Sequence, residues 1–226
     1  MSSETKKRIL TSLALSILLL GMYFYSFIMI VSLIIITTIT WIEFYAIISK
    51  IVTKDFFKHR LFRFIYKSIS LLYLLLLVYF LISIESHHSH LKIYLLYSVL
   101  VTILSDIGGF VIGKNIKGIK LTRISPNKTI SGSIGSFIFA LFLIPLFRNE
   151  LLEFNYLSLI LITLFISFIS QLGDLFISYL KRKANVKNTS DILPGHGGFL
   201  DRIDGMIFAI PIGIFLFNFF WYEKNC

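Results

Sequence analysis

Long apolar runs dominate this chain and restrict the folds that are open to it. Of its 226 residues, 56% are hydrophobic and only 15% are charged. A membrane-spanning helix needs about 20 mostly apolar residues, and a bilayer admits only helices and closed barrels as spanning structures. Because the runs have helical length, they predict an all-α, polytopic integral membrane protein.

These runs predict about seven membrane spans. Residues 9–48 are nearly continuously apolar and long enough for two helices, which we expect to break at 23–26. The other predicted spans are 68–84, 92–112, 131–147, 156–180 and 203–221. We expect one membrane domain over 1–226, with lipid-facing scaffold helices in 1–105 and any active site in the half 106–226. The basic run at 6–8 resembles the start of a signal peptide, but the length of the apolar run favours an uncleaved anchor.

Positive charge is distributed unevenly over this layout. With the N-terminus in the cytoplasm, every Lys and Arg except Lys92, Arg148 and Lys224 falls on the cytoplasmic side. Basic residues concentrate on that side of membrane proteins, so the net charge of +10 requires no nucleic acid as a partner. The polar segments 113–130 and 181–202 then share the cytoplasmic face, where we expect the active site.

Three acids lie inside or at the end of apolar runs, namely Glu43, Asp106 and Asp174. An ionisable group in the bilayer interior costs at least about 2.5 kcal/mol, so each of them is a candidate for function. Asp106 precedes a Gly-Gly pair and Lys114, which favours a substrate or metal site over a helix-end ion pair. For Glu43, a structural and a functional role are equally open.

Asp174 has the strongest context because it belongs to a polar helix face. Steps of three or four residues join the members of this face, which are Thr163, Ser167, Gln171, Asp174, Ser178 and Lys181. For Thr163 and Ser167, a helix–helix contact is the favoured interpretation. For Asp174, the adjoining charged segment favours a functional role.

The segment 178–204 gathers acids, cations and glycines. Asp201 and Asp204 share a helix face, where they are either simple helix-start acids or, together with Asp174, an oxygen-rich site for Mg²⁺. Gly197 and Gly198 leave room for a phosphate to approach the backbone, and the cations that compensate its charge are Lys128, Lys181, Arg182 and Lys187. This combination indicates phosphoryl or nucleotidyl transfer, with a membrane lipid as one substrate.

These residues resemble the C-terminal signature of the phosphatidate cytidylyltransferase (CDP-diacylglycerol synthase) family. The matching positions are Ser178, Lys181, Arg182, Lys187, Ser190, Leu193, Pro194, His196, Gly197, Gly198, Asp201, Arg202 and Asp204. Residues 171–174, 106–129 and 41–44 resemble further motifs of the family. Members of the family often have more spans, so the resemblance gives eight or nine spans as the alternative to seven. Asn188 departs from the signature, because the family has Asp at this position.

The resemblance implies that the cytidylyl group of CTP is transferred to phosphatidate at a bacterial inner or plasma membrane, giving CDP-diacylglycerol and pyrophosphate. It implies Mg²⁺, with a second cation as an option, held by Asp174 and Asp201 with Asp204 close by. The catalytic residues would be Asp174, Asp201, Lys181 and Arg202, and the substrate-binding residues would be Ser178, Arg182, Lys187, His196, Gly197, Gly198, Asp106 and Lys128.

Two other functions remain open from the sequence. A CTP-dependent lipid kinase would use similar groups but would release CDP. A small ion- or proton-coupled transporter would instead use Glu43, Asp106 and Asp174 as intramembrane sites. The apolar helices also permit a homodimer.

Overall fold

A computed structural model describes residues 3–52, 57–87, 91–122, 124–195 and 197–225 of the chain. Every element named within these ranges is a helix. Six helices are long and apolar enough to cross a membrane, namely Thr5–Phe24, Ser26–Ile51, Arg60–Glu85, Lys92–Ile116, Tyr156–Lys183 and Leu200–Trp221, and a shorter apolar segment covers Ile130–Leu146. The prediction of an all-helical, multi-pass membrane protein with about seven apolar spans is therefore confirmed.

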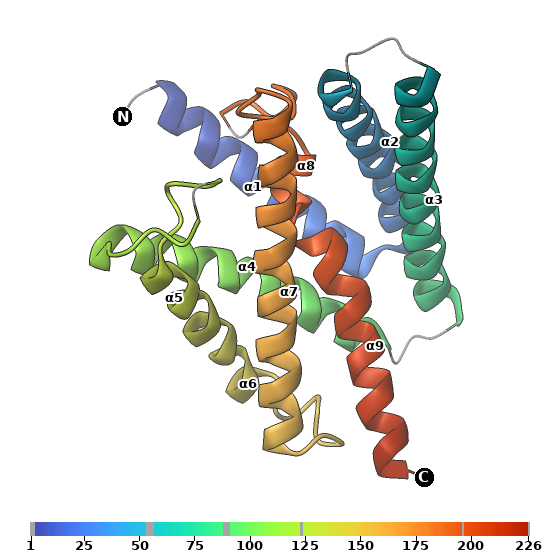
Figure 1. Ribbon diagram of the computed structural model, residues 1–226. Coiled ribbons are helices and arrows are strands. Elements are labelled where there is room, and N and C mark those ends of the chain that lie inside the picture. Colours follow the sequence, from blue (N-terminus) through green and yellow to red (C-terminus); the bar gives the residue numbers. More distant parts are fainter. Residues whose placement is uncertain (1–2, 53–56, 88–90, 123, 196, 226) are drawn as a thin grey trace. The chain divides into compact units, whose positions relative to one another are not determined.

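The chain divides into two compact units. Unit 1 comprises Met1–His88 and Leu180–Ile203, and unit 2 comprises Ser89–Tyr179 and Asp204–Cys226. The helices of unit 1 are α1 (Ser3–Phe24), α2 (Ser26–Ile51), α3 (Phe57–His87) and α8 (Leu200–Ile203), as labelled in Figure 1. Those of unit 2 are α4 (Lys92–Ile116), α5 (Ile130–Leu141), α6 (Leu143–Leu146), most of α7 (Tyr156–Lys183) and α9 (Met206–Asn225). The predicted scaffold and active-site halves stay a prediction.

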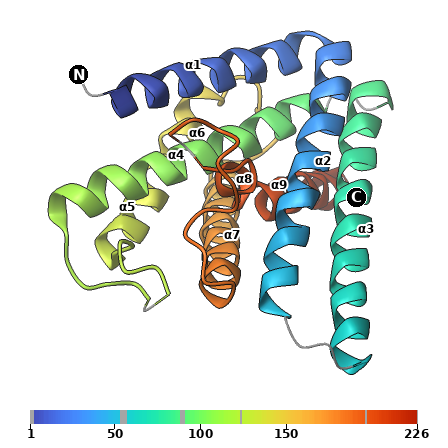
Figure 2. The same ribbon diagram turned by 90° about the horizontal axis from the view of Figure 1, so that it is seen from above.

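In unit 1, a single residue separates α1 from α2. Tyr25 adopts an extended conformation, with φ −125° and ψ 108°, which confirms the break predicted at 23–26. Helices α2 and α3 then lie side by side (Figure 2). Lys67 of α3 joins them, because its Nζ donates to Ser49 Oγ at 2.7 Å and lies 3.1 Å from the centre of the Tyr45 ring.

In unit 2, glycines bring the backbones of α4 and α5 close together. A Cβ atom added at Gly135 would lie 2.5 Å from Ile112 Cβ and 2.8 Å from the carbonyl oxygen of Gly108. At the next residue of each helix, a Cβ at Gly109 would lie 2.7 Å from Ser136 Oγ. Small residues of this kind let membrane helices pack at short range.

The polar face of α7 splits into parts with different roles. Thr163 and Ser167 are fully buried, and their hydroxyls bond to Tyr97 OH at 2.6 Å and Ser105 Oγ at 2.8 Å on α4. Gln171 accepts a bond of 2.5 Å from Ser133 Oγ of α5. The interpretation of Thr163 and Ser167 as helix–helix contacts is therefore confirmed.

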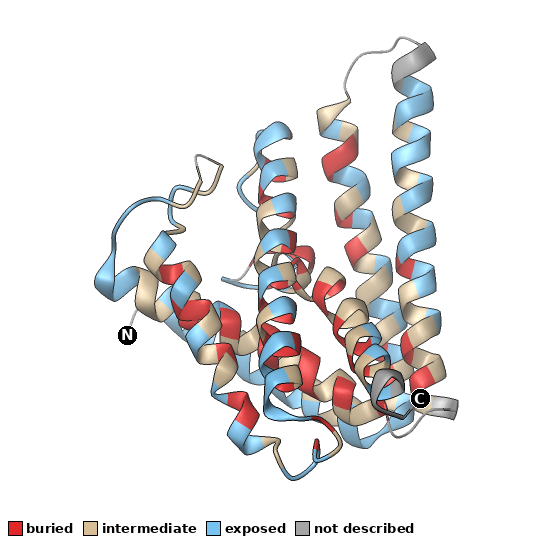
Figure 3. Cartoon of the chain, turned by 60° about the horizontal axis from the view of Figure 1, so that its bottom comes forward, coloured by how far each residue is buried: buried red, intermediate tan, exposed pale blue. Residues whose placement is uncertain are grey.

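The outward faces of the helices suit a lipid solvent. Figure 3 shows exposed positions along the length of the helices, interleaved with buried ones. Large apolar side chains occupy many of the exposed positions, including Phe27, Tyr79 and Leu146, whose exposed fractions exceed 70%. In water such an apolar surface would be an association hazard, whereas in a bilayer it matches the hydrocarbon core.

The α4–α5 packing predicts that Gly135→Ala destabilises the protein by about 1–3 kcal/mol, because the new methyl group would overlap backbone and Cβ atoms that cannot rotate away. Gly21→Ala is the matched control, since its Cβ would meet only the Ile28 side chain at an ordinary 3.5 Å. Thermal unfolding in detergent compares the two variants. Equal unfolding temperatures would contradict the account of this packing.

Candidate active site

Helix α7 ends in a motif that redirects the chain into a loop, residues 184–199, which we call the glycine loop. Asn185 takes a left-handed conformation with φ 55°. The Val186 N–H donates to the Lys181 carbonyl at 3.0 Å, and the Asn185 N–H donates to the Arg182 carbonyl at 3.1 Å. This pattern is a Schellman motif, in which Asn replaces the more usual glycine.

The glycine loop folds back on itself at its far end. Leu193 and Gly197 exchange two backbone hydrogen bonds, of 2.8 and 3.1 Å. Gly195 and Gly197 have φ angles of 76° and 83°, a region that favours glycine because it has no Cβ. His196, which we predicted to bind substrate, lies outside the described residues.

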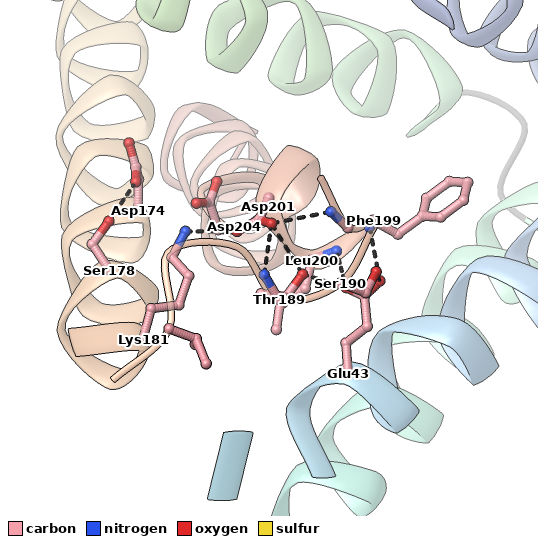
Figure 4. Close-up of polar contacts among 12 residues, drawn as sticks. Glu43, Asp174, Ser178, Lys181, Thr189, Ser190, Phe199, Leu200, Asp201 and Asp204 are labelled. Carbon is pink, nitrogen blue, oxygen red and sulfur yellow. Dashed lines mark hydrogen bonds and ion pairs between the residues drawn. The ribbon is translucent and has the colours of Figure 1, made fainter. Parts of the chain in front are cut away.

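Asp201 of α8 accepts hydrogen bonds from two separate parts of this loop, at Thr189 and at Gly198. Its Oδ1 pairs with Lys181 Nζ at 2.6 Å (Figure 4). Its Oδ2 accepts from Thr189 N at 2.9 Å and Gly198 N at 3.1 Å, and Thr189 Oγ1 lies 3.1 Å from it. The side chains of Lys181 and Asp201 are 10% and 7% exposed, so the ion pair is buried. The loop satisfies the second carboxylate oxygen of Asp201 with hydrogen bonds.

A second buried carboxylate holds the same loop. Glu43 of α2 is 2% exposed and accepts hydrogen bonds from Thr189 and Ser190 on one side of the loop and from Phe199 and Leu200 on the other. The sequence left the role of Glu43 open, and the structure brings it into the cluster around Asp201.

Unit 2 holds a second lysine–carboxylate pair, which joins two predicted site residues, Lys128 and Asp174. Their charged atoms form an ion pair, and Ser178 Oγ donates to Asp174 Oδ1 at 3.3 Å. Both charged side chains are 27% exposed, so this pair is open to water in a way that the Lys181–Asp201 pair is not.

A turn preceding α5 positions Lys128. The Lys128 N–H donates to Ser125 O at 3.0 Å, and the Lys128 carbonyl accepts from Leu121 N at 2.8 Å. Immediately after it, Thr129 caps α5 by accepting from Gly132 N at 3.0 Å. The backbone of Lys128 is therefore fixed between a turn and a capped helix.

The remaining predicted residues differ in exposure. Arg182, Lys187 and Arg202 are exposed in unit 1, and Asp106 is exposed on α4. Asp204 is buried at the start of unit 2's final segment and accepts from the Gly205 N–H at 3.0 Å. In the part of the chain that the structure describes, no three acids, histidines or cysteines are grouped so as to hold a metal ion. The three-carboxylate magnesium site therefore stays a prediction.

The chain matches a known protein family over nearly its whole length. A model described as the cytidylyltransferase family matches residues 1–220. The chain belongs to the cytidylyltransferase family. The match spans both units, so it includes the buried Lys181–Asp201 pair as well as the accessible Lys128–Asp174 pair.

Curated members of the cytidylyltransferase family are similar over part of their length. Phosphatidate cytidylyltransferase of Bacillus subtilis (strain 168) is 39% identical over 155 residues, which cover 68% of this chain and 58% of that protein. The proteins of the same name from Staphylococcus haemolyticus (strain JCSC1435) and Staphylococcus aureus (strain COL) are 43% and 44% identical over 122 residues, covering 53% of this chain and 46% of theirs. The chain thus spans about half the length of the curated relatives it matches.

The structure gives physical reasons for two glycines in the motifs that resemble this family. A Cβ at Gly198 would lie 2.5 and 2.6 Å from the two carboxylate oxygens of Glu43. A Cβ at Gly173 would lie 2.8 Å from the Asp204 carbonyl and 2.7 Å from the Phe208 ring. The sequence suggested that Gly198 admits a phosphate, whereas the structure fills the space beside it with a carboxylate from the chain itself.

Sequence reasoning missed Glu43 and Thr189 as members of the cluster. Their contact joins residues 146 positions apart, which no local pattern reveals. One signal was available for Glu43, since a carboxylate within an apolar helix must find donors inside the protein. Thr189 offered no comparable signal.

Asp201 and Asp174 differ in burial, so replacing each by Asn should change the stability of the protein by a different amount. Asp201→Asn should destabilise the protein by about 3–5 kcal/mol, because it leaves the Lys181 ammonium buried without its partner. Asp174→Asn should cost only about 0–1 kcal/mol, because its pair is partly solvated. Thermal unfolding in detergent measures both variants, and an equal loss in the two would show that burial does not distinguish these pairs.

Proposed function

We propose that this chain transfers the cytidylyl group of CTP to phosphatidate, giving CDP-diacylglycerol and pyrophosphate for phospholipid biosynthesis. The observation that carries the proposal is the cytidylyltransferase family match over residues 1–220. The curated relatives named phosphatidate cytidylyltransferase support the choice of lipid substrate.

In this reaction, a phosphate oxygen of phosphatidate forms a new bond to the α-phosphorus of CTP. The bond from the α-phosphorus to the bridging oxygen of the β-phosphate breaks, and its electron pair leaves with pyrophosphate. Negative charge gathers on the leaving group, so nearby cations stabilise the transition state. The exposed side chains of Arg182, Lys187 and Arg202 in unit 1 carry charge of this sign.

The two lysines serve different purposes in this proposal. Lys181 is buried against Asp201, so its position is set before any substrate arrives. Lys128 is partly exposed beside Asp174, and its ammonium can turn from the carboxylate to a phosphate without loss of charge pairing. Lysine acts here as a mobile point charge rather than as a rigid fork.

Magnesium is part of the proposal, and the carboxylates differ in how well they fit it. Mg²⁺ usually takes one or two carboxylates and fills its other positions with water and substrate phosphates. Asp174 fits because its side chain is partly exposed, whereas Asp201 would first have to exchange the Lys181 ammonium and loop donors for the metal. Once bound, the ion would neutralise phosphate charge.

We also propose that the N-terminus and the glycine loop face the cytoplasm. The support is the uneven distribution of Lys and Arg along the chain. In this orientation only Lys92, Arg148 and Lys224 lie on the side away from the cytoplasm. CTP is a cytoplasmic nucleotide, so this orientation gives the loop access to it.

Purified protein in detergent or vesicles should release pyrophosphate from CTP only when phosphatidate and Mg²⁺ are present. Asp174→Asn should lower the rate at least about 100-fold, because it removes charge at the proposed metal-binding residue. Asp191→Asn is the matched control, since Asp191 is an exposed acid of the glycine loop with no assigned role. Full activity in Asp174→Asn would refute the metal assignment, and release of CDP would refute the reaction.

Cysteine labelling should report the orientation. The chain has one cysteine, Cys226, so Cys226→Ser gives a background for single cysteines introduced at the exposed Asp191 or Glu150. In intact cells, a membrane-impermeant maleimide should label Glu150→Cys and leave Asp191→Cys unlabelled until the cells are opened. The reverse pattern would contradict the proposed orientation.

A further inference from the structure

Glu43 is a buried carboxylate within an apolar helix, where it is stable only if specific partners replace water. It lies within α2, in a span of 26 residues, and only 2% of its surface is exposed. It takes no part in the Lys181–Asp201 pair or the Lys128–Asp174 pair. A charge in this position is tolerated only where hydrogen-bond donors replace its lost hydration.

Four donors surround Glu43, and all of them come from residues 189–200. Its Oε1 accepts from Ser190 Oγ at 2.5 Å and from the Phe199 N–H at 3.1 Å. Its Oε2 accepts from Thr189 Oγ1 at 2.7 Å and from the Leu200 N–H at 2.8 Å. Figure 4 shows these contacts reaching from the α2 side chain to residues 189–190 in the middle of the glycine loop and to residues 199–200 at the start of α8.

The backbone donors identify Glu43 as the cap of α8. Helix α8 begins at Leu200, and the first N–H groups of a helix have no partner within the helix itself. Phe199 and Leu200 donate to Glu43, while the preceding Gly198 N–H donates to Asp201. Three consecutive amides are therefore satisfied by two carboxylates, one from α2 and one from α8.

Thr189 couples the two carboxylates. Its hydroxyl lies 2.7 Å from Glu43 Oε2 and 3.1 Å from Asp201 Oδ2, and its N–H donates to the same Asp201 oxygen. Asp201 in turn holds Lys181. Movement of the Glu43 carboxylate would thus pass through Thr189 to the Lys181–Asp201 pair.

We propose that Glu43 is a positioning residue, which fixes the glycine loop and the start of α8 so that Lys181 and Asp201 are held in place for the nucleotide. The positioning itself stands on the contacts above, and only its consequence for catalysis rests on the proposed function. Glu43 acts through the loop and touches no reacting atom in this assignment.

The number of acceptors explains why a carboxylate is required. Glu43 receives two donors at each oxygen, and both sets include a backbone N–H that cannot rotate away. A glutamine would present its NH₂ group to one of these amides and leave that N–H facing another donor. Glu43→Gln therefore keeps the shape of the side chain and removes half of its acceptors.

Hydrogen–deuterium exchange tests the positioning without any assay of activity. In Glu43→Gln, amides of residues 189–200 should exchange roughly 10-fold faster or more, whereas amides of α4 and α5 should keep their wild-type rates. Glu85→Gln is the matched control, because Glu85 is an acid of α3 in the same unit that accepts from Ser26. Unchanged exchange in 189–200, or equal changes in both variants, would overturn the proposal.

A second variant, in the loop itself, keeps the proposal testable if Glu43→Gln fails to fold. Thr189→Val keeps the shape of that side chain and leaves α2 intact, and it should loosen the same segment because it removes the coupling hydroxyl. Both variants should raise the KM for CTP about 10-fold or more, with a smaller change in kcat, because substrate binding would first have to order the loosened loop. Inactive wild-type protein would refute the proposed function, whereas wild-type exchange in both variants would refute the positioning role.

Discussion

The backbone amides of a loop beside the bilayer must find acceptors within the protein, and here two carboxylates supply them. Glu43 and Asp201 together receive hydrogen bonds from Thr189, Gly198, Phe199 and Leu200. Without these acceptors, residues 189–200 would have to unfold toward water or bury unsatisfied donors, and each such donor costs about 1–3 kcal/mol. The buried Lys181 depends on the same arrangement, because Asp201 is its charge partner.

The same requirement organises unit 2 with uncharged groups. Hydroxyls of Thr163 and Ser167 bond to Tyr97 and Ser105 within the helix packing, and Thr129 caps α5. Unit 1 contains the buried Lys181–Asp201 pair, and unit 2 contains the partly exposed Lys128–Asp174 pair. Because the pairs differ in solvation, we propose a fixed position for the Lys181 ammonium and a mobile one for that of Lys128.

The sequence predicted the spans well because the bilayer imposes a length on any apolar helix, and the break at Tyr25 interrupts a run that is too long for one span. It also anticipated the contacts of Thr163 and Ser167, whose spacing on one helix face is a local property. It did not predict the role of Glu43, whose donors lie 146 to 157 positions away. It did not predict the close approach of Gly108 and Gly135 either, because that contact depends on how α4 and α5 cross.

The central claim is that the α-phosphorus of CTP is the atom that becomes attached to the lipid. Two preparations of CTP, carrying radioactive phosphorus at the α or the γ position, separate this reaction from every transfer of the terminal phosphate. With phosphatidate and Mg²⁺ present, the account predicts that label from the α position enters the lipid phase, while label from the γ position stays in water as pyrophosphate. Entry of the γ label into the lipid would contradict it.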